Sequence, residues 1–451
     1  MSLFVLAHGL VGRTDLPIPK WLFGWAAAVV LVVSFAALAA LWPKPELQKP
    51  RGRRLFAMPR FIEPLLGFLG VAAFAAVVYS GIAGAQDSQD NLAPTIIYVH
   101  FWVGMAVVSV LFGDVFRALN PWRAIARFIA WVAGRLSSGE MPAPLSYPER
   151  LGRWPAAISV LIFTWVELAY VNRDDPSQLA IMALAYAAVQ LVGMSFYGID
   201  RWESRADGFQ ALWSTYARLS PFERRGRDVW IRPPLNGAPR LDLVPGTVAL
   251  LVVAIGTTSF DGFSNGPVWA SLGPSLMRFF HHVFDPTISN ELAESVGLVG
   301  MVALVGLFYR LGVRGMTSVG RGHSTSELSG RFAHTLIPIA FAYALAHYFS
   351  LLLYQGQALG YLISDPLGRG SNLFGTGDAS IDYNALTATG IWYAQVAALV
   401  TGHVSGLVLA HDRALAVYDK PREAVRSQYW MLIVMIGFTS LGLWLLSALT
   451  T

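Results

Sequence analysis

Long runs of apolar residues, separated by short polar segments, recur along the whole chain. A helix that crosses a bilayer needs about 20 mostly apolar residues. Ten runs approach or exceed that length, at 21–42, 62–84, 94–115, 154–172, 178–197, 242–260, 291–310, 331–354, 385–411 and 428–448. The pattern predicts an all-α fold, a polytopic membrane bundle of about ten transmembrane helices.

The basic residues gather in alternate polar segments. Of the 33 Lys and Arg, 28 lie in five segments: 43–61, 116–153, 198–241, 310–331 and 411–427. Connections rich in Lys and Arg stay on the cytoplasmic side of a membrane. Ten spans place all five segments on one side, so we expect both termini outside and the basic loops inside a bacterial cytoplasmic membrane. The net charge of +5 then reports orientation, and nucleic acid is not an expected partner.

The chain is expected to form a single transmembrane domain, 1–451, with a long cytoplasmic connection at 201–240. A helix is predicted there at 203–219, lying along the membrane surface. Its apolar positions follow helical spacing: Phe209, Leu212, Trp213 and Tyr216.

This connection divides the chain into two halves, 1–200 and 241–451, with five predicted spans each. Because five is odd, the second half enters the membrane with opposite polarity, as in inverted-repeat transporters. Ten unrelated packed helices are the alternative, and the sequence leaves both open.

Small residues repeat every four positions along the ninth predicted span. Such a stripe lets helix backbones approach closely within a bilayer. The stripe consists of Gly390, Ala394, Ala398, Gly402, Gly406 and Ala410. We therefore expect this helix to pack most tightly against its neighbours.

Four polar side chains fall at similar depth when each span rises 1.5 Å per residue. They are His100, Glu167, His347 and Gln395. Ionisable groups at membrane depth are costly and mark functional sites by default. His100, Glu167 and His347 could hold a divalent metal ion, or they could relay protons. The further alternative is that each is satisfied separately.

A run of hydroxyl residues precedes Asp261 within Gly256–Gly262, near the predicted end of the sixth span. Transporters use interrupted helices of this composition as ion sites. Asp261 therefore joins the candidate substrate or proton-relay residues.

His334 and His403 form a second group, nearer the predicted cytoplasmic side. Facing histidines are haem ligands in many membrane proteins, so a single b-type haem is one hypothesis. The chain has no cysteine, which excludes disulfides, thiolate metal sites and catalytic thiols.

The leading hypothesis is a secondary transporter or permease for a small solute or ion, coupled to protons through buried His and Glu. A metal- or haem-dependent membrane oxidoreductase is the first alternative, and a non-catalytic subunit of a larger membrane complex is the second. Expected partners are the lipid bilayer and a small solute, ion or proton, with a homo- or hetero-oligomer left open.

Overall fold

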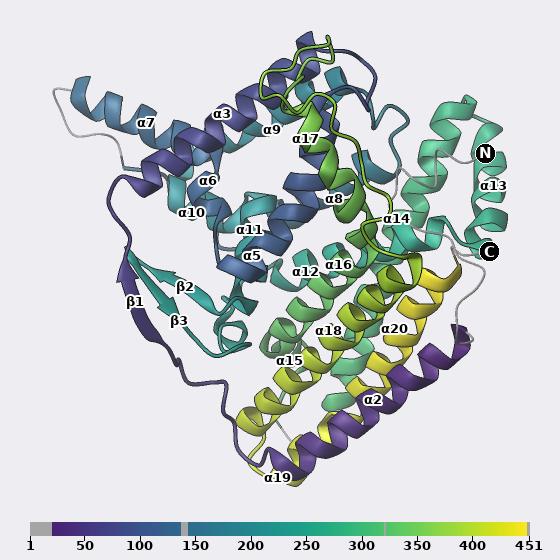
Figure 1. Cartoon of the computed structure of the whole chain (residues 1–451). Helices are drawn as coiled ribbons and strands as arrows, with labels where there is room; N and C mark the ends of the chain where they lie inside the picture. The colour runs from purple at the N-terminus through teal and green to yellow at the C-terminus, as the bar shows by residue number, and fades with distance from the viewer. Residues whose placement is uncertain (1–19, 137–142, 320–321, 449–451) are drawn as a thin grey trace.

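The computed structural model describes residues 20–136, 143–319 and 322–448, and they form a mostly helical bundle (Figure 1). Within these residues, eight helices are long and apolar enough to cross a membrane. Five are single helices: α2 (Lys20–Leu41), α3 (Ile62–Ala83), α9 (Pro176–Tyr197), α14 (Pro286–Met316) and α18 (Ala388–Val417). A sixth, α12 (Thr247–Ser264), is the most deeply buried of the eight. The prediction of a multi-pass helical membrane protein is confirmed.

Two of the eight are composite. Leu92–Phe112 joins α4 (Leu92–Pro94), the π-helix η1 (Thr95–Gly104) and α5 (Met105–Phe112). Thr325–Leu362 joins α15 (Thr325–Phe332), η4 (Ala333–Thr335), α16 (Leu336–Tyr354), η5 (Gln355–Ala358) and α17 (Leu359–Leu362).

The two other predicted spans are also helical. They are α8 (Trp154–Leu168), a shorter apolar helix, and α20 (Tyr429–Ala448). At 1.5 Å per residue, α8 is only about 22 Å long. The count of ten stays a prediction, and both termini lie outside the described residues.

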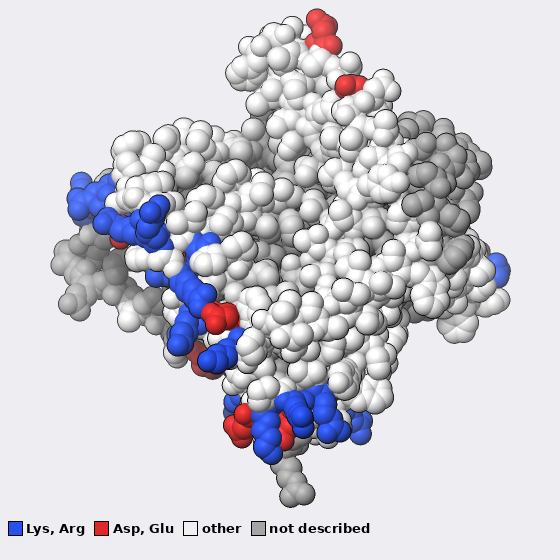
Figure 2. Space-filling model, turned by 60° about the horizontal axis from the view of Figure 1, so that its bottom comes forward, with Lys and Arg blue, Asp and Glu red and all other residues white. Residues whose placement is uncertain are grey.

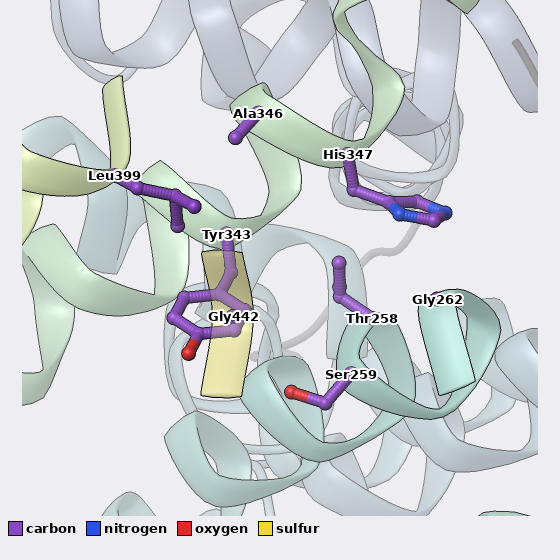
Figure 3. Close-up of a pocket in the computed structure, with 8 residues that line it drawn as sticks. All are labelled: Thr258, Ser259, Gly262, Tyr343, Ala346, His347, Leu399 and Gly442. Carbon is purple, nitrogen blue, oxygen red and sulfur yellow. The ribbon is translucent and has the colours of Figure 1, made fainter. Parts of the chain in front are cut away.

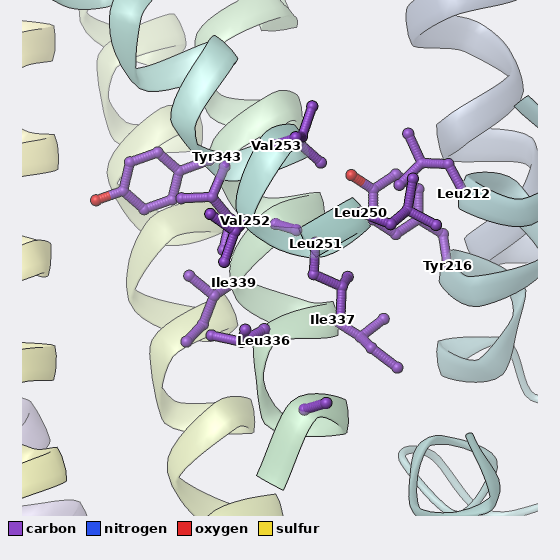
Figure 4. Packing of buried hydrophobic residues seen from close by; sticks show 14 of the residues in the cluster. Leu212, Tyr216, Leu250, Leu251, Val252, Val253, Leu336, Ile337, Ile339 and Tyr343 are labelled. Carbon is purple, nitrogen blue, oxygen red and sulfur yellow. The ribbon is translucent and has the colours of Figure 1, made fainter. Parts of the chain in front are cut away.

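Helix α12 lies at the centre of the bundle. It packs against α8, α14 and α16, and 14 of its 18 residues are buried. Its residues Leu250–Val253 contact a large apolar cluster that also takes in Ile337 and Tyr216 (Figure 4). A helix that is apolar all round is expected in such a position.

The small-residue stripe brings α18 directly against α16. A Cβ added at Gly402 would lie 2.2 Å from the Cβ of Ala342 and 2.8 Å from the carbonyl oxygen of Pro338. At Gly406 it would lie 3.0 Å from the carbonyl oxygen of Thr335. Only glycine fits here without a clash, so the backbones of α16 and α18 pack in close contact.

Helix α2 packs against α18 and α20. On α2, the Phe23 ring meets Trp392 of α18 edge to face, with ring centroids 5.5 Å apart. Further along, Phe35 meets Tyr429 of α20 at 5.8 Å. The beginning and the end of the described chain therefore form one side of the bundle (Figure 1).

The prediction of one surface helix at 203–219 is wrong. The chain forms α10 (Ile199–Arg205), breaks, and begins again as α11 (Gly208–Tyr216), capped by the Asp207 carboxylate, which accepts from the Gln210 N–H. The apolar face of α11 is buried against α8 and α5 inside the bundle. Helical spacing of apolar residues is the same for a helix on a membrane and a helix inside a protein, so it could not separate the two.

A small antiparallel sheet, which the sequence pattern did not predict, joins two distant connections. Strand β1 (Arg53–Ala57) pairs with β3 (Asp228–Ile231), which pairs in turn with β2 (Phe222–Arg225). Three further short helical segments lie in the connections between the long helices: α6 (Phe116–Leu119), η2 (Ala217–Leu219) and η3 (Ala238–Arg240). The predicted linker 201–240 is thus built into the fold.

Basic side chains line one side of the molecule in Figure 2, while the top of that view carries acidic ones. Two surface helices, α7 (Pro121–Leu136) and α19 (Pro421–Ser427), contribute Lys or Arg residues. Several are paired: Arg123 Nη1 contacts Asp200 Oδ1 at 2.9 Å, and Arg117 Nε contacts Glu203 Oε1 at 2.8 Å. The helix α13 (Pro267–His281) packs on α14 elsewhere in the bundle.

Candidate functional site

The hydroxyl run of α12 lies within an unbroken helix, so the predicted interruption is wrong. Thr257, Thr258 and Ser259 each donate a hydrogen bond to the carbonyl four residues earlier, at 2.9, 3.0 and 2.8 Å. These bonds keep the hydroxyls within their own helix. Helix α12 continues to Ser264, so Asp261 belongs to the buried helix and not to a loop at its end.

Asp261 on α12 forms a pair with His347 on α16. The Oδ2 atom of Asp261 lies 2.7 Å from Nε2 of His347. Asp261 is 1% exposed and His347 is 4% exposed, so solvent does not reach the pair directly. A carboxyl group and an imidazole in hydrogen-bond contact can pass a proton between them.

Two further groups approach this pair. Tyr348, the next residue on α16, lies near both Asp261 and Glu167. Its ring also meets the His347 ring edge to face at 4.7 Å. Glu167 lies in the last turn of α8, is buried, and keeps its Oε2 atom without a hydrogen-bond partner. We call Asp261, His347, Glu167 and Tyr348 the acid–imidazole cluster.

The structure therefore joins two of the four residues predicted to share a layer, Glu167 and His347. His100 lies in the π-helix η1, with its ring next to Gly356 of η5, and its Nε2 atom has no partner. Gln395 is buried on α18. Among the residues that the structure describes, no three His, Cys, Asp or Glu side chains gather closely enough to hold a metal ion. The set His100, Glu167 and His347 is not supported as a metal centre.

A small cavity, with room for about one water molecule, adjoins the pair. Tyr343, Ala346 and His347 of α16 lie across it from Thr258, Ser259 and Gly262 of α12 (Figure 3). Leu399 of α18 and Gly442 of α20 complete the lining. We call this space, with one imidazole in its wall, the first cavity.

A second, somewhat larger cavity lies between α12, α14, α16, α18 and α20. Its lining is mostly apolar and includes His403. The hydroxyl of Tyr343, which lines the first cavity, donates to the carbonyl of Phe438 at 2.8 Å, and Phe438 lines the second. The Tyr343 ring also contacts the His403 ring, with centroids 5.8 Å apart. Tyr343 thus lies between the two cavities.

The two histidines proposed as haem ligands have different surroundings. His403 lines the second cavity, whereas His334, in η4, is not among its lining residues. His334 is 1% exposed, and its Nε2 atom has no hydrogen-bond partner. The cavity beside His403 therefore does not bring the two histidines together, and the haem hypothesis is not supported.

Sequence reasoning missed Tyr348 and Tyr343. Both lie on the same span as His347, and Tyr343 precedes it by one helical turn. A tyrosine hydroxyl in an apolar helix needs a partner, and that signal was available.

Comparison of the chain with protein-family models, with curated proteins and with solved structures finds no match.

Proposed function

We propose that the chain is a secondary transporter that moves a small solute together with protons. In this proposal the acid–imidazole cluster takes up a proton from one side of the membrane and releases it to the other. Solute binds next to His347, and the first cavity widens to admit it.

The observation that carries the proposal is the buried pair of Asp261 and His347, with 2.7 Å between its atoms, at the meeting point of α12 and α16. Ionisable groups inside a bundle are expensive to bury and are typical of ion and proton pathways. Glu167 adds a second carboxyl group, and Tyr348 lies near both acids. The cluster therefore has several proton-binding atoms within one buried volume.

The two cavities support a pathway through the bundle. Both lie between the same helices, α12, α16, α18 and α20, and Tyr343 separates them. Movement of the Tyr343 side chain would connect them, which is the kind of gate that alternating access requires. The predicted ten spans and inverted repeat belong to this proposal as its expected topology.

The test uses purified protein in liposomes that contain a pH-sensitive dye. A panel of amino acids, organic acids and sugars is added outside, and internal acidification is recorded. We expect at least one class of solute to drive proton entry. The variants Asp261→Asn and His347→Gln should reduce the initial rate by about tenfold or more, on the scale of a lost proton-transfer group.

Matched controls are Asp378→Asn and His281→Gln, which change exposed residues outside the cavities. Both should retain the rate of the unmodified protein. If no solute in the panel drives proton entry, or if the Asp261 and His347 variants keep full rates, the proposal is wrong.

A further inference from the structure

The second cavity contains two thioether groups and one imidazole. Met431 and Met435 lie one turn apart on α20 and both line the cavity, and His403 lines it from α18. Residues four apart lie on the same face of a helix, so both methionines extend from one side of α20. The Met431 sulfur also lies beside Gly312 of α14. Both methionines are 5% exposed.

The His403 ring, which lines this space, has one nitrogen without a hydrogen-bond partner. Its Nδ1 atom lies 2.8 Å from the carbonyl oxygen of Leu399, which accepts a hydrogen bond only if Nδ1 carries the proton. Nε2 is then left with its lone pair. The side chain is fully buried, and Nε2 has no hydrogen-bond partner. A histidine whose other nitrogen is fixed to a backbone carbonyl has the arrangement of a metal ligand.

The other polar groups in the lining are already engaged. The hydroxyl of Tyr309 donates to the carbonyl of Ser329 at 2.7 Å, and that of Thr335 donates to the carbonyl of Phe332 at 2.8 Å. The described residues that line the cavity include no carboxylate. An ion held here would therefore meet only neutral donors.

These donors select the type of ion. Thioether sulfur is a soft ligand and favours Cu(I) among the metals of proteins. A neutral, apolar cavity disfavours a divalent ion more than a monovalent one, because the cost of burying charge grows with the charge. We infer that the second cavity binds one soft monovalent metal ion, Cu(I) or its analogue Ag(I), through Met431, Met435 and His403. This inference goes beyond the proposed proton-coupled transport and needs no redox step.

The test is a titration of the purified, detergent-solubilised full chain with Ag(I), and with Cu(I) under anaerobic conditions in competition with a chromophoric chelator. We expect one ion per chain. The double variant Met431→Leu/Met435→Leu keeps side-chain volume. It should weaken binding by about a hundredfold or more, because even outer-sphere changes at metal sites cost roughly 10–100-fold. X-ray absorption of the Cu(I) form should show both sulfur and nitrogen neighbours.

Two controls separate this site from nonspecific binding. Met194→Leu alters a buried methionine on α9, outside the cavity. His334→Gln alters a buried histidine whose Nε2 is also unpartnered. Both should bind as the unmodified protein does. The inference is overturned if the unmodified chain binds no ion, or if the controls lose as much affinity as the double variant.

Size-exclusion chromatography shows whether each variant is folded, and His403→Gln serves as an independent single change if the double variant is not. Because binding is measured in detergent without a pH gradient, this result is independent of the transport experiment. Failure of either one leaves the other standing.

Discussion

Asp412, on α18, links this helix to the segment that follows α2. Its Oδ1 atom accepts from the indole N–H of Trp42 at 3.1 Å and from the backbone N–H groups of Glu46 and Leu47 at 2.5 and 3.1 Å. Its Oδ2 atom accepts from the side-chain N–H of Gln48 at 2.6 Å. All four donors are satisfied by one buried carboxylate, which therefore holds segment 42–48 in place.

The variant Asp412→Asn tests this role. In this variant one carboxylate oxygen, which accepts hydrogen bonds, is replaced by an amide N–H donor. That donor would face the N–H groups that now donate to Asp412, so a buried N–H is left unpaired, which costs about 1–3 kcal/mol. We expect a lower midpoint of thermal unfolding in detergent. Asp419→Asn, an exposed change near the same helix end, should stay within about 0.5 kcal/mol of the unmodified protein. Equal effects of the two changes would contradict this role.

Asp175 caps α9, and its carboxylate accepts from the backbone N–H groups of Gln178 and Ser177. These bonds, with that from Gln178 the largest influence, lower the pKa of Asp175. A lowered pKa in the folded state means that the stabilisation is present above the unfolded value and is lost as the pH falls through the folded one.

Asparagine caps helices about as well as aspartate but does not titrate here. We therefore expect Asp175→Asn to match the unmodified protein at pH 7 and to be the more stable of the two near pH ~3, below the ordinary Asp range. Asp175→Ala should lose about 1 kcal/mol at pH 7. Thermal unfolding at both pH values tests this. If the stability difference between Asp175→Asn and the unmodified protein is the same at both pH values, titration of Asp175 does not contribute to stability.

At this scale, the sequence could identify residues but not their partners. Asp261, Glu167 and His347 were recognisable because acidic and imidazole groups are rare in apolar runs. Their meeting depends on the rotation of α12, α8 and α16 about their axes. Spans that are apolar on every side carry no polar face to indicate that rotation. Asp261 was also placed beyond its helix, because the hydroxyl run resembled an interruption.

At the scale of elements, the contact between α16 and α18 depends on the absence of a side chain at Gly402. Its neighbours are a Cβ atom and a backbone carbonyl, neither of which can rotate away. The two helices can accept an added methyl group only by moving apart. Overpacking of this kind costs about 1–3 kcal/mol or more.

Gly402→Ala should therefore lower the thermal unfolding midpoint and reduce the yield of folded protein. The matched control is Gly437→Ala on α20, where an added Cβ would meet nothing within 4 Å. That change should be neutral or stabilising by up to about 1 kcal/mol, since alanine favours a helix over glycine. If both changes act alike, close packing at Gly402 is not the cause.

The elements themselves were largely predictable from the sequence. Their apolar length follows from the thickness of a bilayer, and eight of the predicted spans meet that criterion in the described residues. The burial of α11 and the three-stranded sheet were not predictable. A strand of five residues such as β1 takes its partner from the connection 171 residues or more further along, which no local pattern records.

At the scale of the whole molecule, the uneven distribution of Lys and Arg predicts which side of the helical bundle faces the cytoplasm. The chain has no cysteine, so single cysteines can report on topology without further changes. Ser371→Cys lies in an exposed segment that we expect outside, and Lys420→Cys lies at the exposed start of α19, which we expect inside.

In intact cells, a membrane-impermeant maleimide should label Ser371→Cys at once. Lys420→Cys should react only after the cells are made permeable, because the reagent does not cross the bilayer. Immunoblotting with a mass-tagged maleimide provides the measurement. The reverse pattern would invert the orientation, and labelling of both from outside would exclude an odd number of spans between them.

Helix α2 can pack against α18 and α20 only after these later helices have been synthesised. When α2 leaves the ribosome, the rings of Trp392 and Tyr429 that will cover Phe23 and Phe35 have not yet been made. Strand β1 likewise waits for β3, since Arg53 pairs with Ile231. Until synthesis is nearly complete, lipid must occupy the face of α2 that later contacts protein. A chain that stops before α18 would therefore keep its first helix inserted but undocked.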